Sequence, residues 1–418
     1  MAILRVSPNL ALDQAVAQRQ ADGEPLVHMG FGEARLPVFE PFVERLAAGS
    51  AATAYGPVAG GAAAREAVAG YFTRRRMPTG ADQVMLAPGS KPLLMALQLA
   101  VPGDVLIPQP AWNSYAAQAA MAGKQVFGVP IPAACGGVPD PEEMRRTLRA
   151  ARARGHSPRI VVLTLPDNPT GTLASPHLVH EVCAVAEEED LIIISDEIYR
   201  DIVHDPATPF LSPAEVAPHR TIVTTGLSKA LALGGWRIGV ARFPADGCGR
   251  RIHDDMVCIA SEVWSTLSMP MQAVAEYAFS EPSEVQEQLT TSARLHGAVA
   301  RAVHGILTGA GASCRPPAGG FYVYPDFEPL REELGYRRIT DSSSLFQHLL
   351  DTYGIAVLAG HHLGDDEGAL RFRAATSLLY GDTRELQQLA LDSPDPVRLP
   401  HISAVLERLD ESFAKLTS

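Results

Sequence analysis

The chain of 418 residues is long enough to form one large or two ordinary domains with a substantial core. Charged residues make up 20% and hydrophobic residues 46% of it, which is typical of a globular protein and excludes a disordered one. The net charge of −12 argues against nucleic acid or an anionic membrane as the main partner, but leaves room for a small anionic substrate.

The five cysteines are scattered, odd in number and without a CxxC pair. This usage fits a reducing compartment and indicates no metal site. No run approaches the ~20 apolar residues of a membrane span, and residues 1–25 lack the apolar core of a signal peptide. We therefore expect a cytoplasmic protein.

The N-terminal quarter predicts an arm and an amphipathic helix. Residues 1–27 indicate an arm with a short helix, and HMGFGEARLP (28–37) contains a tight glycine turn. In residues 51–76, an aromatic turn leads into a helix whose apolar face comprises Ala64, Val68, Tyr71 and Phe72.

From residue 83 the pattern changes to short apolar runs separated by helical segments. Most of these runs are too apolar to alternate with polar residues, which indicates strands covered on both faces. Strands that alternate with helices predict an α/β domain with a mostly parallel sheet, whose ligands bind at the carboxyl ends of the strands. The seven expected strands are 83–89, 104–110, 125–131, 159–166, 191–197, 221–226 and 238–244.

The last third of the chain predicts a smaller α+β domain. After a mainly helical stretch come an aromatic strand expected over 319–327, two more over 354–360 and 369–376, and a terminal helix. The segment 381–400 indicates a helix followed by a proline-broken loop. We expect residues 1–41 to form the arm and part of the small domain, 42–295 the large domain, and 296–418 the rest of the small domain.

One stretch, TTGLSKALALGGWRIG (224–239), combines a lysine at the end of an expected strand with an arginine among glycines. Desolvation at such a position favours the neutral, nucleophilic amine of Lys229. The guanidinium of Arg237 suits a phosphate dianion. An amine and a phosphate clamp together are what a protein needs to hold pyridoxal phosphate as a Schiff base.

Suitable groups also follow other expected strands. The turn before Ser90 leads into a helix whose free amides can bind an anion. Trp112 can stack on a flat ring, and Asn168 presents a neutral amide at a strand end. Asp196 directly follows a buried strand and needs a cationic partner, such as a protonated pyridine nitrogen; Tyr199 can donate to a phenolate oxygen of the same ring.

The motifs GLSKALALGGWRIG, DNPTGT, SDEIY, the GSK turn and PAW occur in an order that resembles the class I/II aminotransferase superfamily over about residues 25–380. This resemblance implies a fold-type I, pyridoxal phosphate-dependent α/β enzyme with a seven-stranded, mostly parallel sheet flanked by helices. It implies that Lys229 is the Schiff-base lysine and general acid/base, that Asp196 pairs with the pyridine nitrogen, that Asn168 and Tyr199 bind the ring hydroxyl, and that Trp112 stacks on the ring.

The resemblance also implies a phosphate site. Ser90, the backbone amide of Lys91 and Arg237 would hold the phosphate, with Ser228 assisting. Tyr55 resembles the tyrosine that reaches the phosphate of the other subunit, which implies a homodimer.

For the substrate, Arg371 in LRFRAATS aligns with the family's arginine for the α-carboxylate, and Gly32 with its backbone partner; Asn168 would contribute too. Arg373, two positions on, is the other candidate, but we expect Arg371 to face the substrate.

Some positions depart from the family pattern. Gly226 replaces a phosphate-binding serine, and the turn after residue 358 reads AGHHLG, which brings His361 and His362 to a place where they could face the substrate. We expect transamination between an L-amino acid and a 2-oxo acid. The alternative is a pyridoxal phosphate enzyme of secondary metabolism that performs elimination, replacement, cyclisation or oxidation. Both need the same residues, so the motifs do not separate them.

Overall fold

A seven-stranded sheet lies at the centre of the large domain in the computed structural model, which describes residues 6–418. Its strand order is β2-β8-β7-β6-β5-β3-β4; β8 runs antiparallel to both of its neighbours, and the other pairs are parallel. The predicted strands and their mostly parallel arrangement are confirmed. The strands are β2 (Val84–Ala87), β3 (Asp104–Gln109), β4 (Val126–Pro130), β5 (Pro158–Thr164), β6 (Ile192–Asp196), β7 (Thr221–Gly226) and β8 (Gly239–Arg242).

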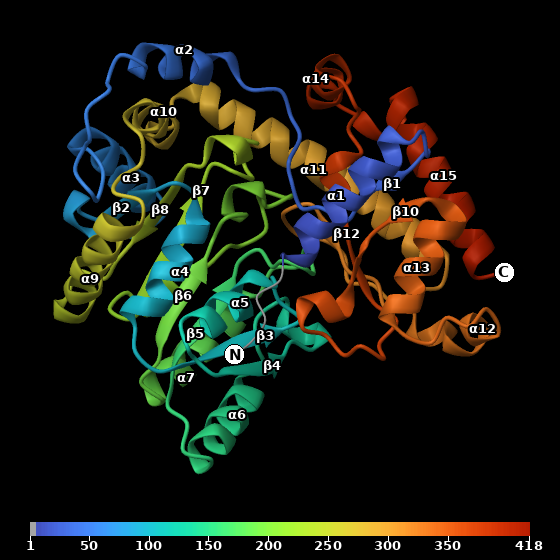
Figure 1. Ribbon diagram of the computed structural model, residues 1–418, viewed down its shortest axis with the longest axis horizontal. Helices are drawn as coiled ribbons and strands as arrows, with labels where there is room; N and C mark the ends of the chain where they lie inside the picture. The colour runs from blue at the N-terminus through green and yellow to red at the C-terminus, as the bar shows by residue number, and fades with distance from the viewer. Residues whose placement is uncertain (1–5) are drawn as a thin grey trace.

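The strands are apolar because helices cover both faces of the sheet (Figure 1). Along β5, Ile160 and Val162 belong to one hydrophobic cluster, whereas Val161 and Leu163 belong to another, as alternation along a strand requires. The first cluster includes residues of α4 (Ser90–Ala100), α5 (Ser114–Met121) and α9 (Gly247–Val263); the second includes residues of α6 (Pro141–Ala153) and α7 (Pro176–Glu188).

A third cluster closes the sheet at its β2–β8 end. It joins the predicted helix α3 (Ala62–Arg74) to α10 (Met269–Ser280), near α2 (Glu40–Gly49). All four residues that we predicted for the apolar face of α3 are buried: Ala64, Val68, Tyr71 and Phe72.

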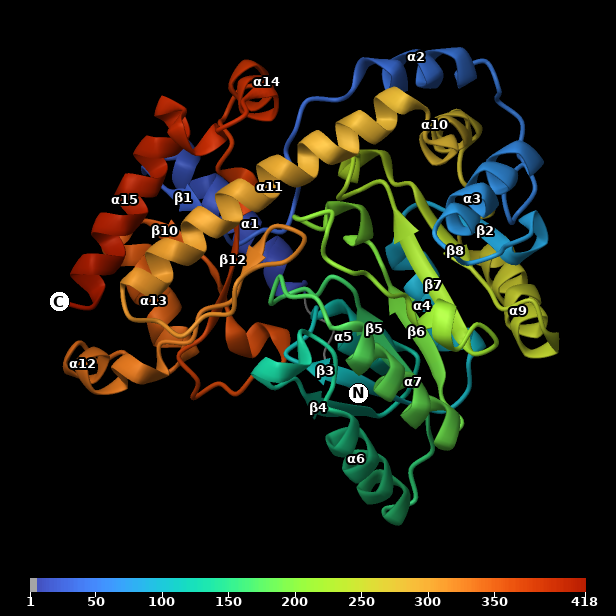
Figure 2. The ribbon, with the colours of Figure 1, turned by 180° about the vertical axis from the view of Figure 1, so that it is seen from behind.

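The C-terminal part packs small sheets against helices, beside the large sheet (Figure 2). The 27-residue helix α11 (Ser283–Gly309) extends from the large sheet into this part, so the predicted domain boundary after residue 295 falls inside one helix. The strands of the C-terminal part are β9 (Tyr322–Val323), β10 (Ile355–Ala356), β11 (Leu358–Ala359) and β12 (Phe372–Ala375). Besides α11, its long helices are α13 (Ser342–Tyr353) and α15 (Pro400–Leu416). The domain boundaries remain a prediction.

The aromatic strand expected over 319–327 is confined to two residues of β9. Its preceding backbone is used differently: Ala318 N donates to Gly171 O at 2.8 Å, and Gly320 N donates to Ile202 O at 2.9 Å. These bonds attach the segment to loops of the large domain. A backbone amide that donates to a loop is not available to a sheet, so the strand is short.

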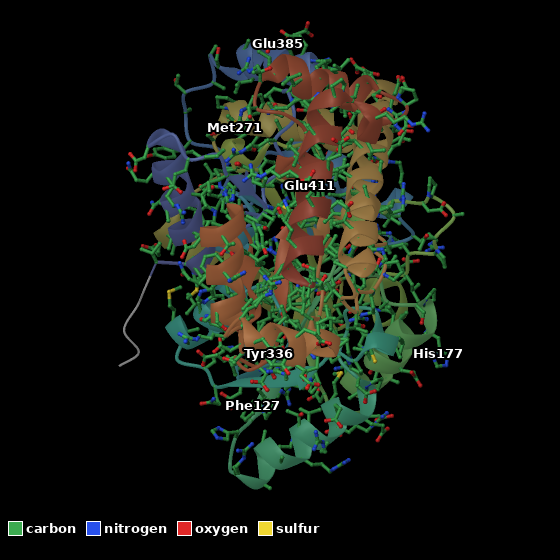
Figure 3. The ribbon with its side chains drawn as sticks, turned by 90° about the vertical axis from the view of Figure 1, so that its right-hand side faces the viewer. Phe127, His177, Met271, Tyr336, Glu385 and Glu411 are labelled. Atoms are coloured by element: carbon green, nitrogen blue, oxygen red, sulfur yellow. The ribbon has the colours of Figure 1, made fainter. Side chains whose placement is uncertain are left out.

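Elements from both ends of the described chain, α1 (Pro8–Ala21) and β1 (Val27–His28) near one end and α15 near the other, pack in the small domain. The N-terminal helix α1 is followed by β1, which pairs with β10. The segment 381–400 contains α14 (Arg384–Asp392), as expected, before α15 begins. Figure 3 shows α15 from outside, with Glu411 on its exposed face; Ile402, Leu409 and Phe413 are buried on the other face.

Among residues 6–418, no helix combines the length and the apolar character needed to cross a bilayer.

Candidate active site

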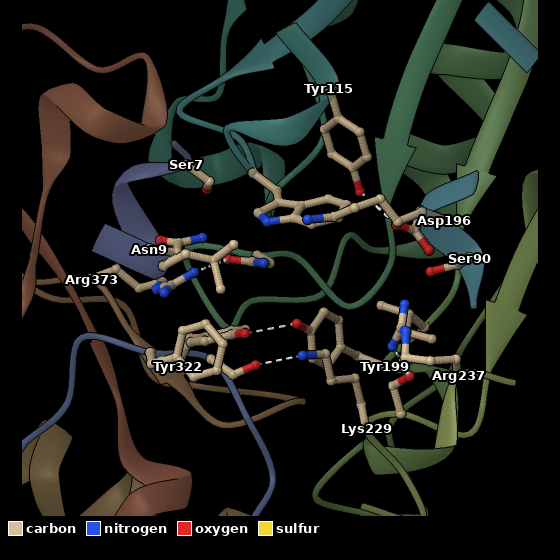
Figure 4. A pocket seen from close by; sticks show the side chains of 18 residues that line it. Ser7, Asn9, Ser90, Tyr115, Asp196, Tyr199, Lys229, Arg237, Tyr322 and Arg373 are labelled. Atoms are coloured by element: carbon tan, nitrogen blue, oxygen red, sulfur yellow. Dashed lines mark hydrogen bonds between the residues drawn. The ribbon is translucent and has the colours of Figure 1, made fainter. Parts of the chain in front are cut away.

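A cavity of about 350 Å³ opens where the carboxyl ends of the central strands face the small domain (Figure 4). It collects side chains that follow β2, β3, β5, β6 and β7 of the large sheet, and others from the N-terminal helix, β9 and β12. Of the expected site residues, those that line it are Gly32, Ser90, Lys91, Trp112, Asn168, Asp196, Tyr199, Ser228, Lys229 and Arg237.

Lys229 follows β7 and points across the cavity toward the N-terminal segment, where its Nζ donates a hydrogen bond to Gly32 O. Burial, and after it the nearby positive charge of Arg373, lower the pKa of Lys229 to about 8. The neutral amine, which a nucleophile or general base requires, is therefore far more populated near neutral pH than in an ordinary lysine.

Asp196 ends β6 and is only 2% exposed. Its carboxylate accepts hydrogen bonds from Tyr115 OH at 2.8 Å and from Thr224 Oγ1 at 3.3 Å, and it makes no ion pair among residues 6–418. Burial raises the pKa of Asp196 to about 6, against the lowering effect of these hydroxyls. A buried acid with hydroxyl partners and no cation fits a protonated ring nitrogen of pyridoxal phosphate.

The other expected ring contacts lie nearby but already have protein partners. Tyr199 OH is 2.7 Å from Tyr322 OH, and Asn168 Oδ1 accepts a hydrogen bond from Arg373 Nη1 at 3.1 Å. The amide nitrogen of Asn168 has no recorded hydrogen bond within the described chain, so it can donate to a ring hydroxyl. Burial raises the pKa of Tyr199 well above its ordinary value, which keeps its hydroxyl protonated.

The expected phosphate site is a close-packed cradle at the start of α4. Gly89 has φ +92°, and a Cβ at this residue would lie 2.2 Å from Arg237 Nη2. Arg237 Nη1 donates to Gly234 O at 2.8 Å, and its second contact there is Ser228 Oγ at 3.5 Å. The helix amides, the hydroxyls and the guanidinium fit the phosphate of the cofactor.

The cradle also explains why Gly226 stands where a serine was expected. A Cβ at Gly226 would lie 2.5 Å from Ile238 O, because β7 and β8 approach closely there. Its partner Gly239 is tighter still: a Cβ would lie 2.2 Å from Gly89 C and 2.3 Å from Ser90 N. The two glycines let the turn before α4 lie directly on β8.

The expectation that Arg371 faces the substrate was wrong. Its guanidinium is held by Asp326 and Asp365 beside a different cavity. Arg373 lines the active-site cavity instead and is 1% exposed, and its Nη2 donates to Gly30 O at 2.9 Å. Arg373 Nε is buried and has no hydrogen-bond partner among the described residues.

The histidines of the AGHHLG turn also lie elsewhere. His361 Nδ1 is 2.7 Å from Ser342 Oγ, and His362 lines a neighbouring apolar cavity beneath α1, so neither faces the substrate cavity as we considered. Tyr55 is 88% exposed and does not line the cavity of its own chain.

Sequence reasoning missed several lining residues. Tyr115 could have been found, because it lies one helical turn after Trp112 and aromatic residues at that spacing share a face. No pattern in the sequence signals that α1 joins the site, since its contact with the large domain is long-range: Asn9 Nδ2 donates to Asn113 Oδ1 at 3.4 Å. The missed residues are Ser7, Asn9, Leu10, Phe31, Tyr115, Ile198 and Tyr322.

The family described as aminotransferase class I and II matches residues 24–386. The chain belongs to this family. This aminotransferase is an enzyme that transfers amino groups with pyridoxal phosphate. It is 29% identical over 373 residues to the aspartate/prephenate aminotransferase of Thermus thermophilus, which covers 85% of this chain and 89% of the relative.

Two further comparisons agree. A bifunctional aspartate aminotransferase and glutamate/aspartate-prephenate aminotransferase of Petunia hybrida is 31% identical over 402 residues, covering 92% of this chain and 80% of the relative. The solved structure of the Thermus thermophilus aspartate aminotransferase with maleate superimposes with a TM-score of 0.80 at 26% identity, covering 99% of this chain and 97% of that one. These names favour transamination over elimination, replacement, cyclisation or oxidation by this aminotransferase.

Substitution of Gly239 by Ala is expected to weaken binding of pyridoxal phosphate at least about 10-fold, because the new methyl group must displace the backbone of Gly89 and Ser90. Gly235→Ala is the matched control, since a Cβ there meets no atom within 4 Å. The measurement is a titration of each apoprotein with cofactor. Equal dissociation constants for the two variants would contradict the cradle.

Proposed function

We propose that this aminotransferase binds α-amino acids and 2-oxo acids through Arg373, and that the residues of the cavity perform amino-group transfer between them. The observation that carries the proposal is the guanidinium of Arg373, which lines the cavity and is oriented by Asn168 and Gly30. Amino donor and amino acceptor both carry a carboxylate next to the reacting carbon, so one guanidinium serves both halves of the reaction.

When bound, pyridoxal phosphate supplies an electron-withdrawing ring that stabilises negative charge on the substrate's α-carbon. Asp196 would keep the proton on the ring nitrogen, supported by the hydroxyls of Tyr115 and Thr224. Lys229 would remove the proton from the substrate's α-carbon with its neutral amine and would return it to the carbon of the cofactor that carried the aldehyde group. Its lowered pKa supports this role.

The residues of the cradle would hold the phosphate and thereby orient the ring. Ser90, the backbone amide of Lys91, Ser228 and Arg237 are the proposed phosphate ligands, and Trp112 would cover one ring face. We further propose a homodimer in which the exposed side chain of Tyr55 reaches the phosphate bound by the partner subunit. The exposure of Tyr55 supports this assignment, because its 88% exposed side chain is free to contact another subunit.

The cavity's remaining cation favours an acidic substrate. With Lys229, Arg237 and Arg373 assigned to proton transfer, phosphate and α-carboxylate, the amine of Lys91 is left, 5.1 Å from the centre of the Trp112 ring. Burial and the charge of Arg237 lower the pKa of Lys91, and a bound anion would relieve both effects. We propose that it binds the side-chain carboxylate of a dicarboxylic substrate, which agrees with relatives named aspartate aminotransferases.

The function is tested first at Lys229. The wild-type protein reconstituted with pyridoxal phosphate is expected to absorb visible light and to release one equivalent of 2-oxo acid per site from an amino acid in a single turnover. Lys229→Ala should lose the band and slow the turnover by at least about 10³-fold, because the amine that moves the proton is gone. The exposed Lys415→Ala is the matched control. A wild type that binds no cofactor would contradict the proposal.

Substitution of Arg373 by Lys is expected to lower kcat/KM for every amino acid and 2-oxo acid by about 100-fold, because a point charge replaces a bidentate clamp. The visible band should stay within a few nanometres of the wild type. A simple alkylamine, which has no carboxylate, provides the control: its slow reaction with the bound cofactor should be unchanged. An equal loss for amino acids and alkylamine would show that Arg373 does not recognise the carboxylate.

Substitution of Lys91 by Met is expected to lower kcat/KM for aspartate by about 10- to 100-fold, because it removes one charge-assisted hydrogen bond. Alanine, which has no side-chain carboxylate, should lose less than about 3-fold. Steady-state kinetics with both amino acids make the comparison. The same loss for aspartate and alanine would assign Lys91 to the phosphate instead.

A further inference from the structure

The turn Gly360–Leu363 of the small domain lies against the segment 109–111 of the large domain. Leu363 O accepts a hydrogen bond from Ala111 N at 2.9 Å, and Gly364 O accepts one from Gln109 Nε2 at 2.5 Å. The two acceptors are backbone carbonyls, one of the last residue of the turn and one of the residue after it. Both hydrogen bonds therefore require the turn to stay in place. The next residue after Ala111 is Trp112, whose ring lines the active-site cavity.

Arg371 holds this turn from the other side. Its backbone O accepts from Gly360 N at 2.9 Å, and its Nη1 donates to both carboxylate oxygens of Asp365, at 3.2 and 3.3 Å. Its Nε donates to Asp326 Oδ2 at 2.8 Å, and Tyr324 OH donates to Asp365 Oδ2, also at 2.8 Å. Arg371 therefore holds the turn at its first residue, Gly360, and at Asp365, two residues after its last.

The charges around Arg371 favour its ion pairs within the protein and disfavour binding of a substrate carboxylate. Two carboxylates, Asp326 and Asp365, already share its single positive charge, and the Asp365 side chain is only 9% exposed. A third carboxylate at this guanidinium would be repelled by both. Arg373, two residues later, forms no ion pair with an acidic side chain within residues 6–418.

His361 also holds the turn in place, through a side-chain contact with Ser342. Its Nδ1 is 2.7 Å from Ser342 Oγ, and Ser342, the first residue of α13, donates its hydroxyl to Glu367 O at 3.1 Å. The unusual histidine of the turn thus contacts the small domain itself. Its place in the fold is structural support for the turn.

The segment that the turn holds carries two groups of the active site. Trp112 packs edge-on against Tyr115, with ring centroids 5.3 Å apart and planes at 89°, and Tyr115 OH donates to Asp196. Movement of Ala111 would shift the ring that covers the cofactor and, through this aromatic contact, the hydroxyl that supports the acid. A loss of the fastening should therefore be visible in the cofactor's own environment.

We propose that Arg371 is a positioning residue: with Asp365 it fixes the turn Gly360–Leu363 against Ala111, and thereby sets Trp112 over the cofactor ring. This role rests on the proposed function in one respect, namely that Trp112 covers the ring. It gives Arg371 a task distinct from that of Arg373.

Arg371→Met tests the proposal in the reconstituted enzyme. Its expected signature is a 5- to 20-fold rise in the dissociation constant of pyridoxal phosphate and at least a halved visible circular dichroism of the bound cofactor. At saturating cofactor, KM for the 2-oxo acid should change less than 3-fold while kcat falls. Arg371→Lys should restore part of the dichroism, and Asp365→Asn should reproduce the Met signature without adding to it in the double variant.

Two further variants complete the design. Gln109→Leu breaks the contact to Gly364 without touching Arg371, so it should give the same signature, more weakly, even where Arg371→Met fails to fold. Arg398→Met, at an arginine whose side chain is 85% exposed, should behave as the wild type. Unchanged cofactor affinity and dichroism in Arg371→Met and Gln109→Leu would overturn the proposal.

The opposite result would also overturn it. A 100-fold rise in KM for all α-carboxylate substrates, with normal dichroism in Arg371→Met, would show that Arg371 binds substrate. Failure of the proposed function itself is recognised separately, by a wild type that binds cofactor but transfers no amino group.

Discussion

The buried carboxyl group of Asp196 is the constraint around which the site is built. It lies at the end of a central strand, and its neighbours supply two hydroxyl donors and the backbone amide of Ile198. Burial alone would favour its neutral form, as its raised pKa shows. An ionised acid buried without a cation destabilises the folded protein. The protonated ring nitrogen of the cofactor would supply that cation.

The remaining groups come from parts of the chain that are far apart in sequence. Lys229 bonds to Gly32 near the N-terminus, and Arg373 near the C-terminus bonds to Asn168 and Gly30. These contacts cross between the large and small domains. The cavity therefore exists only when both domains are folded and packed, and the amine, the acid and the guanidinium each owe their surroundings to that packing.

The sheet could be predicted because its strands are covered on both faces and read as unbroken apolar runs. The lysine, the acid and the phosphate cradle could be predicted because each follows directly from a strand, where local sequence dictates geometry. The contributions of α1 could not, since no local pattern tells a surface helix which distant loop it will touch. The domain boundaries and the roles of individual site residues stay predictions.

By itself, the sequence determined the α/β fold, the family and the cofactor chemistry, because strand periodicity and contiguous motifs are local properties of the chain. Only the tertiary structure decided between Arg371 and Arg373. Two arginines two positions apart on a strand differ little in their local sequence, but Asp326 and Asp365 neutralise one, whereas the other meets an amide and a carbonyl. Long-range packing supplies these partners, and partners determine which charge remains for a substrate.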